Sequence, residues 1–226
     1  ASALKSSLLQ LSSSIGDRVR AGDLSSQPTI ANSAVAAVSR GTLTGRGTYS
    51  LEVTQLAANQ VLTSAPFAAA TTPTGSGSLT FRFGSIAGAA FVDDLSHAPA
   101  SITIPSGSTL ADVATAIHAA YVASGTDGAH LMFKGKEGAA SGFVIEATET
   151  VGEEGLAALA WTPATAPAQL LSTARDAAFK LDGLAMTSAT NAITDLVPGL
   201  SLKLTGTNIG APTTIRFSDP GAAVST

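Results

Sequence analysis

The side chains in this sequence that could do chemistry are few and widely spaced. The three histidines, His97, His118 and His130, show no spacing that would place two of them on one element as metal ligands. The chain contains no cysteine, which excludes disulfides, thiolate nucleophiles and cysteine-based zinc sites. We therefore expect each histidine to have a surface or packing role, and we predict no metal site.

Two pairs of adjacent carboxylates stand out, Asp93-Asp94 and Glu153-Glu154. Neighbouring side chains point apart on a strand or a helix, so these pairs favour solvated loops over a general acid and base. Residues 138–142 are one position out of register with the G-x-S-x-G nucleophile elbow, and we interpret them as a turn. Residues 75–77 lack the third glycine and the helix of a dinucleotide-binding loop. The sequence thus predicts no catalytic residue, no cofactor and no enzyme.

The composition and charge limit the kinds of partner that the protein is expected to bind. The formal net charge is −4, the sequence pI is near 5.2 and no basic run exceeds an isolated pair, so nucleic acid is not an expected partner. The apolar content comes mainly from small residues, with 5% aromatic and 12% charged residues, which predicts thin, layered packing. No window approaches the ~20 apolar residues of a membrane span, so we expect no membrane insertion.

The N-terminal stretch predicts an amphipathic helix. Its apolar residues recur at steps of four, three, four and four, and Gly22 is a natural stop. A lone helix with one apolar stripe must dock against something. Either it packs inside its own domain, or it is a coiled-coil or bundle leg whose partner helices lie outside this chain. The stripe consists of Leu4, Leu8, Leu11, Ile15 and Val19.

Most of the remaining chain has the period-two pattern of half-buried strands. Tyr49, Leu51 and Val53 alternate with polar residues, and residues 78–83 do the same. Between these strands, residues 65–77 are rich in Pro, Thr, Gly and Ser, which indicates a linker or a domain crossing. Further strands are predicted at 102–104, 130–133, 143–147, 178–181, 200–204 and 215–217.

One internal helix is clearly predicted after the turn at residues 105–107. Thr109 with Asp112 three residues later resembles a capping box, and an apolar stripe runs from Leu110 through Val113 and Ile117 to Tyr121. His118 falls on the polar flank of this helix. Residues 155–161 could be strand or helix, and Asp182-Gly183 predicts a hairpin turn. Strands outnumber helices by about three to one, so the fold class is mainly β with some α.

Three stretches resemble the bacterial flagellar filament cap family, FliD, also called hook-associated protein 2. The first matches the family pattern G-x-Y-x-[IVL]-x-V-x-x-L-A, and the second matches its strand, turn and helix, with His118 where Asn is more usual. The third resembles the start of the family's second conserved half. The stretches are GTYSLEVTQLA (47–57), IPSGSTLADVATAIHAA (104–120), and ARDAAFKLDG (174–183) continued by NAITD (191–195) and GLSLKL (199–204).

This resemblance implies an α+β fold with two small β-rich domains, one inserted into the other, plus an N-terminal leg helix. Residues 1–40 would hold the leg helix and a connector. Residues 41–66 together with 172–226 would form a discontinuous β-rich head domain, and residues 67–171 an inserted β-rich domain with one helix. The family's disordered N-terminal segment and long C-terminal helices are missing from the sequence, so we expect a head-domain fragment with one leg helix.

The resemblance also implies a structural capping protein at the distal end of the flagellar filament, which promotes flagellin assembly through protein–protein contacts. Expected partners are other copies in a homo-oligomeric ring, flagellin and an export chaperone, while contact with a host surface stays open. The expected location is extracellular, at the flagellum tip, after export by the flagellar type III route, which fits the lack of cysteine. Leu4, Leu8, Leu11 and Ile15 are the expected partner-binding residues.

Two other classes of protein are alternatives to the cap. Ser/Thr-rich strands with exposed loops also suit an adhesin or carbohydrate-binding β module, but only Trp161 and two tyrosines are available for stacking on a sugar. A hydrolase is less favoured still, because no nucleophile with a base at a sensible spacing is found.

Overall fold

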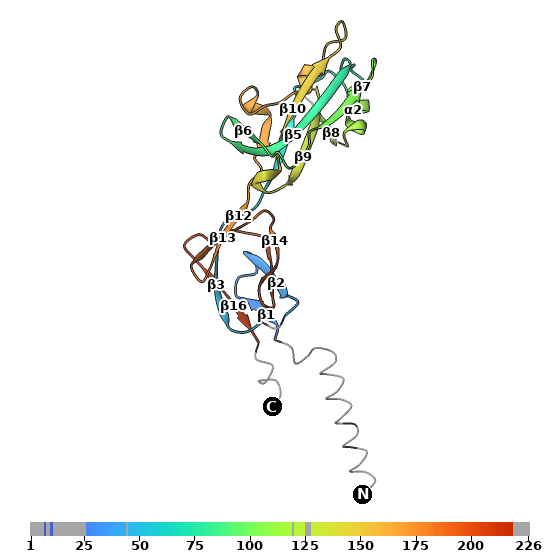
Figure 1. Ribbon diagram of the computed structural model, residues 1–226. Helices are drawn as coiled ribbons and strands as arrows, with labels where there is room; N and C mark the ends of the chain where they lie inside the picture. Colours follow the sequence, from blue (N-terminus) through green and yellow to red (C-terminus); the bar gives the residue numbers. More distant parts are fainter. Residues whose placement is uncertain are drawn as a thin grey trace. The chain divides into compact units, whose positions relative to one another are not determined.

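The computed structural model describes Ser7, Gln10 and residues 26–218 apart from 44, 119 and 125–127, with the side chains of 120–124 and 167 also left out. The chain folds into two compact units (Figure 1). The first comprises residues up to Thr54, Phe179–Met186 and the stretch from Asn191 onward, and the second comprises Gln55–Ala178 and Thr187–Thr190.

Two sheets supply the strands of the first unit. The larger has the order β1-β16-β3-β12-β13 and the smaller the order β14-β15-β2. Strand pairs β1/β16, β16/β3, β14/β15 and β15/β2 are antiparallel. The strands are β1 (Pro28–Ile30), β2 (Ala36–Arg40), β3 (Thr48–Gln55), β12 (Ala177–Leu181), β13 (Leu184–Ser188), β14 (Ala192–Val197), β15 (Leu200–Leu204) and β16 (Thr213–Phe217).

The core of the first unit is largely aliphatic and follows the predicted alternation. Leu200, Leu202 and Leu204 are all buried on β15, and Leu51 and Val53 are fully buried on β3. This agreement is expected, because successive side chains on a strand point to opposite faces of the sheet. The alternating sequence pattern therefore assigned the inward face of both strands correctly.

The predicted hairpin at Asp182-Gly183 is confirmed. It joins β12 to β13, and both turn residues have positive φ, 50° for Asp182 and 84° for Gly183, as a type I′ turn requires. Asp182 also ties the turn to β3, since its Oδ1 accepts a 2.7 Å hydrogen bond from the backbone N–H of Ser50. The backbone N–H of Asp182 in turn donates to the carbonyl of Ser50 at 2.8 Å.

The second unit contains two four-stranded sheets, one helix and three short 3-10 turns among its described residues. In one sheet β5 pairs with β10, β6 and β7, and the other has the order β11-β4-β9-β8. Its elements are β4 (Asn59–Thr63), β5 (Gly77–Ala87), β6 (Ala90–Asp93), β7 (Ala100–Ile104), α2 (Leu110–Ala116), β8 (Ala120–Ser124), β9 (Gly128–Glu137), η1 (Ala139–Ser141), β10 (Gly142–Glu149), η2 (Leu156–Leu159), η3 (Pro167–Gln169) and β11 (Leu170–Ser172).

A buried glutamine connects the two sheets of the second unit. Gln60, on β4, is 0% exposed. Its side-chain amide donates to the carbonyl of Phe143 at 2.8 Å and accepts from the N–H of Phe143 at 2.7 Å. These two hydrogen bonds satisfy the backbone N–H and carbonyl of Phe143 at the edge of β10. Both groups are buried away from water, where an unpaired backbone group would be costly. The amide thus fastens β10 to β4.

The predicted helix exists but is shorter than the sequence pattern suggested. Thr109 caps it in the predicted capping box: its backbone N–H donates to Asp112 at 2.9 Å, and the N–H of Asp112 donates to Thr109 at 3.3 Å. The helix ends at Ala116, so Tyr121 lies on β8 and His118 lies beyond the helix with a φ of 52°. The helical placement of both residues was wrong, because pairing of β8 with β9 replaces the last predicted turns.

Two further stretches differ from their predictions. Residues 65–77, predicted as a linker or a domain crossing, are part of the second unit, because Phe67 exchanges backbone hydrogen bonds with Ala129 at 2.7–2.8 Å, and Pro73 forms a bridge with Thr109. The ambiguous residues 155–161 form the 3-10 turn η2, followed by Trp161. That side chain is 2% exposed, and its Nε1 donates to the carbonyl of Ala166 at 2.8 Å.

The fold class is confirmed as mainly β with a helical contribution. Leu4, Leu8, Leu11 and Ile15 lie outside the described residues, so the predicted leg helix stays a prediction. The predicted domain boundaries, after residues 40, 66 and 171, likewise stay a prediction. Within the part of the chain that the structure describes, no helix is both long enough and apolar enough to cross a bilayer.

Candidate functional site

The most distinctive hollow in the described residues is an aromatic groove in the second unit. Two neighbouring cavities of about 170 and 430 Å³ share Phe83, Lys134, Gly135 and Phe143 in their walls. Together we call them the aromatic groove. Its lining residues are Phe81, Phe83, His97, Ile117, His118, Phe133, Lys134, Gly135, Lys136, Ala140, Ser141 and Phe143.

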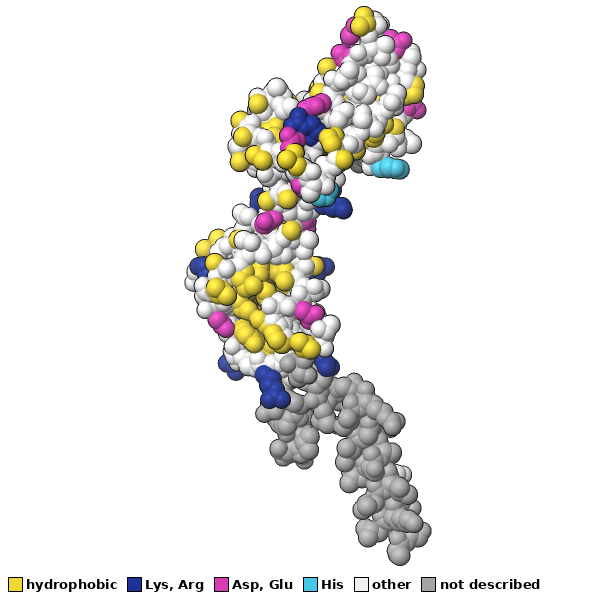
Figure 2. All heavy atoms as spheres, in the orientation of Figure 1, with side chains coloured by type: hydrophobic (Ala, Val, Ile, Leu, Met, Phe, Trp, Pro, Cys, Tyr) yellow, Lys and Arg dark blue, Asp and Glu magenta, His cyan; other side chains and the backbone are white. Residues whose placement is uncertain are grey.

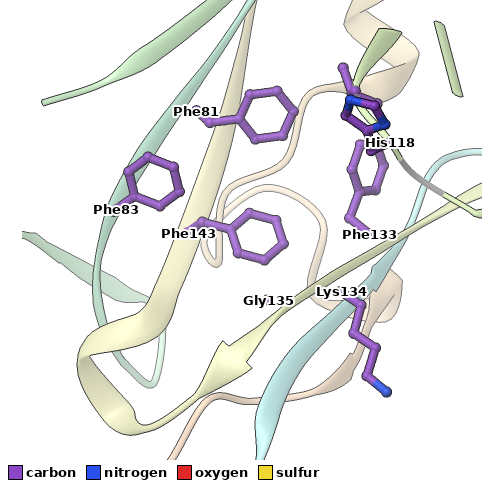
Figure 3. Close-up of a pocket in the computed structure, with 8 residues that line it drawn as sticks. Phe81, Phe83, His118, Phe133, Lys134, Gly135 and Phe143 are labelled. Atoms are coloured by element: carbon purple, nitrogen blue, oxygen red, sulfur yellow. The ribbon is translucent and has the colours of Figure 1, made fainter. Parts of the chain in front are cut away.

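The rings of the groove come from facing strands of the two sheets. Phe83 and Phe143 are directly opposite each other on β5 and β10, and Phe81 lies two residues before Phe83 on β5 (Figure 3). Phe133 comes from β9, with its ring centroid 6.2 Å from that of Phe81. Phe81 and Phe143 are 6.5 Å apart at an interplanar angle of 47°. These separations lie within the range of favourable aromatic pairs, so the rings support each other.

The inward face of β9 forms one wall of the groove. Ala129, Leu131 and Phe133 are buried at alternate positions, and the next inward position is Gly135. A Cβ placed there would lie 3.2 Å from the ring of Phe143 and 3.2 Å from the carbonyl of Ser141. The missing side chain therefore lets β9 lie close against Phe143 and Ser141, and a larger residue at this position would require these neighbours to shift.

Two lysines and two histidines lie around the groove. Lys134 and Lys136 are exposed on β9 and alternate with Phe133 and Gly135, so their side chains lie on the opposite face of the strand; Figure 3 shows Lys134 pointing away from the rings. His97 and His118 are also exposed and line the larger and the smaller cavity respectively. None of the described residues that line the groove is acidic. The groove thus has an apolar floor, while the two lysines present their ammonium groups to the other face of β9.

The three histidines do not assemble into a metal site. His97 Nδ1 lies 2.7 Å from Asp94 Oδ2, while His130 Nδ1 lies 3.0 Å from the carbonyl of Ser64. Within the described residues no three His, Asp or Glu side chains are placed to hold one ion. Hydrogen bonds from Ser96, and then from His97, lower the pKa of Asp94 to about 2, so this carboxylate stays ionised at neutral pH.

The adjacent carboxylates Asp93 and Asp94 point to different partners, as the sequence suggested. Arg82 holds Asp93 through Nε at 2.9 Å and also pairs with Glu146, while its guanidinium lies 5.6 Å from the centroid of the Phe91 ring. Hydrogen bonds with Asp93, and then with Glu146, raise the pKa of Arg82. Asp94 contacts Ser96 and His97 instead. The carboxylates form ion pairs and a loop contact, which are structural uses.

The comparisons with known proteins agree with this fold. A family model described as the C-terminus of flagellar hook-associated protein 2 matches residues 174–221. The A-type flagellar hook-associated protein 2 of Pseudomonas aeruginosa is 29% identical over 200 residues, which cover 79% of this chain and 40% of that relative. The resemblance to the flagellar cap family is confirmed. The chain nevertheless spans well under half of this curated relative.

Solved cap proteins share the fold across both units. The D1-D2-D3 domains of the Escherichia coli flagellar cap protein FliD superpose with a TM-score of 0.70 at 20% identity, over 90% of this chain and 62% of that one. FliD from Pseudomonas aeruginosa PAO1 superposes with a TM-score of 0.67 at 23% identity, over 82% and 85% of the two chains. The E. coli D2-D3 domains alone give 0.69 at 19% identity, over 86% and 98%.

The aromatic groove was missed by the sequence analysis. The alternation of Phe81 and Phe83 predicted a strand, but nothing local indicated that Phe133 would face them from another sheet. One usable signal was present. Gly135 lies two residues past Phe133, just beyond the predicted strand at 130–133, and a glycine inside a strand often marks a bulge or the close approach of another segment.

Figure 2 shows that, on the face drawn, charged side chains are scattered and no large area carries a single sign. Hydrophobic side chains gather over part of the first unit on that face. In the described residues several large apolar side chains are more than half exposed. They are Leu43, Val92, Leu95, Val151, Leu171, Leu184 and Ile209. A chain that works by surface contact would use such side chains more readily than a buried catalytic cluster.

Proposed function

We propose that this chain is the head region of a flagellar filament cap protein, which acts by protein–protein contact and not by catalysis. The supporting observation is the coincidence of two independent likenesses: the hook-associated protein 2 match at residues 174–221 and the superposition of 90% of the chain on a flagellar cap protein. In this proposal one domain is inserted into the other. The protein stands at the filament tip as a homo-oligomeric ring and promotes addition of flagellin.

The proposal extends to export and to the leg helix. Passage through the flagellar type III channel requires an unfolded chain, and the absence of cysteine keeps the chain free of disulfides that would hinder it. An export chaperone is a proposed partner for the same reason. Leu4, Leu8, Leu11 and Ile15 would pack on helices supplied by the rest of the full-length protein. Exposure of such a stripe without a partner would be unfavourable.

Complementation tests the cap function directly. A motile bacterium whose cap gene is deleted receives the full-length parent of this chain, and electron microscopy and swimming assays measure filament formation. We expect filaments to return. A matched control restores the strain with a parent that lacks residues 55–178 and 187–190, the second unit. Absence of filaments with the full-length parent, when the protein is expressed and exported, would contradict the proposal.

The leg contact is tested by sedimentation of the full-length protein beside a Leu8→Asp, Leu11→Asp variant. Two charged side chains on the apolar stripe should weaken assembly and lower the unfolding temperature, since burying each charge unpaired is costly. A Ser7→Asp, Gln10→Asp variant adds the same charge off the stripe and serves as the control. Unchanged assembly and unchanged thermal stability in the first variant would remove the leg from the proposal.

The adhesin alternative is not favoured by the comparisons, because the relatives reported above are described as flagellar cap or hook-associated proteins. Host-surface contact remains a proposal that a glycan array would test. Binding by the wild-type chain that persists in a Trp161→Phe variant would argue against sugar stacking on Trp161, which is already buried at 2% exposure.

A further inference from the structure

The sheet that contains β9 has an outer face, on the side of the strand opposite the aromatic groove. Leu131 and Phe133 point inward and belong to the hydrophobic core. Successive side chains on a strand point to opposite faces, so Met132, Lys134 and Lys136 stand on the outer face. Both lysines are exposed, and Figure 3 shows Lys134 directed away from the rings. The outer face is therefore open to solvent where it carries these two cations.

Apolar side chains lie beside the two lysines on this outer face. Val61 on β4 is directly opposite Lys134, and Met132 is its diagonal neighbour. On β11, which pairs with the other side of β4, Leu170 packs against the core, so Leu171 points outward and is 59% exposed. Val61, Met132 and Leu171 belong neither to the core cluster nor to the hydrophobic residues packed against it. The lysine face, as we call it, consists of Val61, Met132, Lys134, Lys136 and Leu171.

The positive charge of the lysine face is not balanced by a neighbouring carboxylate. Neither Lys134 nor Lys136 takes part in any of the ion pairs found among the described residues. The chain as a whole has a net charge of −4, so this face is opposite in sign to the rest of the molecule. Two cations beside apolar side chains complement a partner that carries carboxylates next to an apolar surface.

We propose that the lysine face binds an acidic amphipathic helix of a partner protein. A helix that lies over an open sheet face is a common two-layer arrangement. The apolar stripe of the helix would cover Leu171, Val61 and Met132. Carboxylates along one flank of that stripe would pair with Lys134 and Lys136. Residues two apart on a strand are separated by about 7 Å, which is close to the spacing of side chains at i and i+4 on a helix.

Other occupants fit the lysine face less well than an acidic helix does. A second copy docked through the same face would bring the lysines of both copies together, and like-charge repulsion opposes this. Binding to an anionic membrane takes a cluster of about four to eight basic residues, and single-stranded nucleic acid needs a basic track with stacking rings. The lysine face offers two lysines and no ring. The inference stands apart from the proposed cap function, because a chain that fails to cap a filament can still bind such a helix.

The test is a fluorescence anisotropy titration of the 226-residue chain. The probe is a labelled, alanine-rich peptide of about 20 residues, which is long enough to be helical in water. It carries a leucine stripe, with glutamates at i and i+4 along one flank. A small apolar contact with two exposed ion pairs should give a Kd between about 10 μM and 1 mM. Two further peptides, with lysines for the glutamates or alanines for the leucines, should bind at least about tenfold more weakly.

A charge-reversal variant locates the ionic part of the contact. Lys134→Glu with Lys136→Glu should weaken binding of the glutamate peptide at least about tenfold, because two attractions become repulsions. The matched control, Lys203→Glu with Arg216→Glu, makes the same charge change at exposed strand positions of the first unit. It should leave the Kd within about twofold.

A second variant locates the apolar part of the contact. Leu171→Ser removes the most exposed apolar side chain of the lysine face and should weaken binding about threefold or more. The matched control is Leu184→Ser, at a side chain of the first unit that is 68% exposed. It should leave the Kd within about twofold.

Folding is checked separately with the fluorescence of Trp161, the only tryptophan in the chain, which lies in the second unit. The four variants change exposed side chains, and Leu171→Ser keeps the test valid even if the double lysine variant unfolds. The proposal is overturned by no saturable binding up to about 1 mM, by equal loss in the control variants, or by equal binding of the lysine peptide.

Three further results would assign the lysine face to another occupant and would also overturn the proposal. The first is a change in the sedimentation of the chain alone in the double lysine variant, which would indicate a second copy. The second is tighter binding to vesicles of phosphatidylcholine and phosphatidylserine at about three to one than to the glutamate peptide. The third is tighter binding of a labelled single-stranded oligonucleotide.

Discussion

The two units use the same β architecture with different side chains. Phe179 and Phe217 are the two phenylalanines of the first unit, whereas the other six of the chain's eight, together with its single tryptophan, belong to the second unit. Aliphatic residues on short strands fill the first unit closely. In the second unit large rings from two sheets line a groove, with Gly135 of β9 close against Phe143. Rigid rings that meet across two sheets can thus leave a hollow between them.

The largest expected effects come from the two cores. Leu131→Ala in the second unit and Leu51→Ala in the first each remove a fully buried side chain and should cost about 2–5 kcal/mol of unfolding free energy. Urea denaturation should show Leu131→Ala lowering the midpoint of the Trp161 fluorescence transition, because Trp161 reports on the second unit. Leu51→Ala should act mainly on the far-UV circular dichroism transition. Equal shifts of the Trp161 transition in both variants would mean that the two units unfold as one.

The next largest difference is expected from two side-chain amides, one in each unit, whose loss should lower the unfolding free energy by different amounts. Gln60→Leu leaves the N–H and carbonyl of Phe143 unpaired at a site with 0% exposure, so it should cost about 2–3 kcal/mol. In the first unit, Asn208 makes comparable bonds, accepting from the N–H of Val53 at 2.6 Å and donating to the carbonyl of Leu51 at 2.9 Å. That side chain is only half-buried, so water can replace it, and Asn208→Leu should cost about 1 kcal/mol. Chemical denaturation measures the unfolding free energy of both variants. A larger loss of unfolding free energy in Asn208→Leu than in Gln60→Leu would contradict the expected order.

Removing the N-terminal cap of helix α2 should change the unfolding free energy by a smaller amount. Thr109→Ala removes the N-cap of α2 and should cost about 1 kcal/mol, since its hydroxyl and Asp112 then lose their reciprocal contacts. The control is Thr29→Ala on β1, whose exposed hydroxyl bonds to the carbonyl of Arg216 and which should stay within about 0.5 kcal/mol of wild type. Thermal unfolding followed by circular dichroism distinguishes them. Equal effects would show that the cap contributes nothing beyond an ordinary surface hydroxyl.

The smallest expected effect is a difference in acid sensitivity. Hydrogen bonds lower the pKa of four carboxyls in the second unit below the unfolded values and of one, Glu52, in the first. A lowered folded pKa stabilises the native state above the unfolded pKa, and that stability is lost as the pH falls through the folded pKa. The four carboxyls are Asp94, Asp112, Glu149 and Glu153.

Urea midpoints followed by Trp161 fluorescence should therefore fall between about pH 5 and pH 2, and more steeply than midpoints that report on the first unit. Because these carboxyls are at least partly open to solvent, the effect should be modest and should shrink in high salt. An Asp94→Asn variant should reduce the slope, while Asp176→Asn serves as a control of the same type. A steeper acid response from the first unit would contradict the assignment of these carboxyls.

The sequence by itself determined the features that depend on near neighbours. The alternation at Leu200, Leu202 and Leu204 identified a strand and its buried face, and Asp182-Gly183 identified a turn that demands positive φ. Thr109 and Asp112 marked the start of α2. Each of these signals lies within a few residues, so the local backbone conformation that produces it can be deduced from a short stretch.

Only the tertiary structure decided the features that depend on distant partners. The helix stops at Ala116 because β8 pairs with β9, and residues 65–77 join the second unit because Phe67 bonds to Ala129. The aromatic groove exists because Phe133 on β9 meets Phe81 from the other sheet. Side-chain pattern specifies which face of a strand is buried, but the strand it will face is set by the free energy of long-range packing, which no local stretch of residues contains.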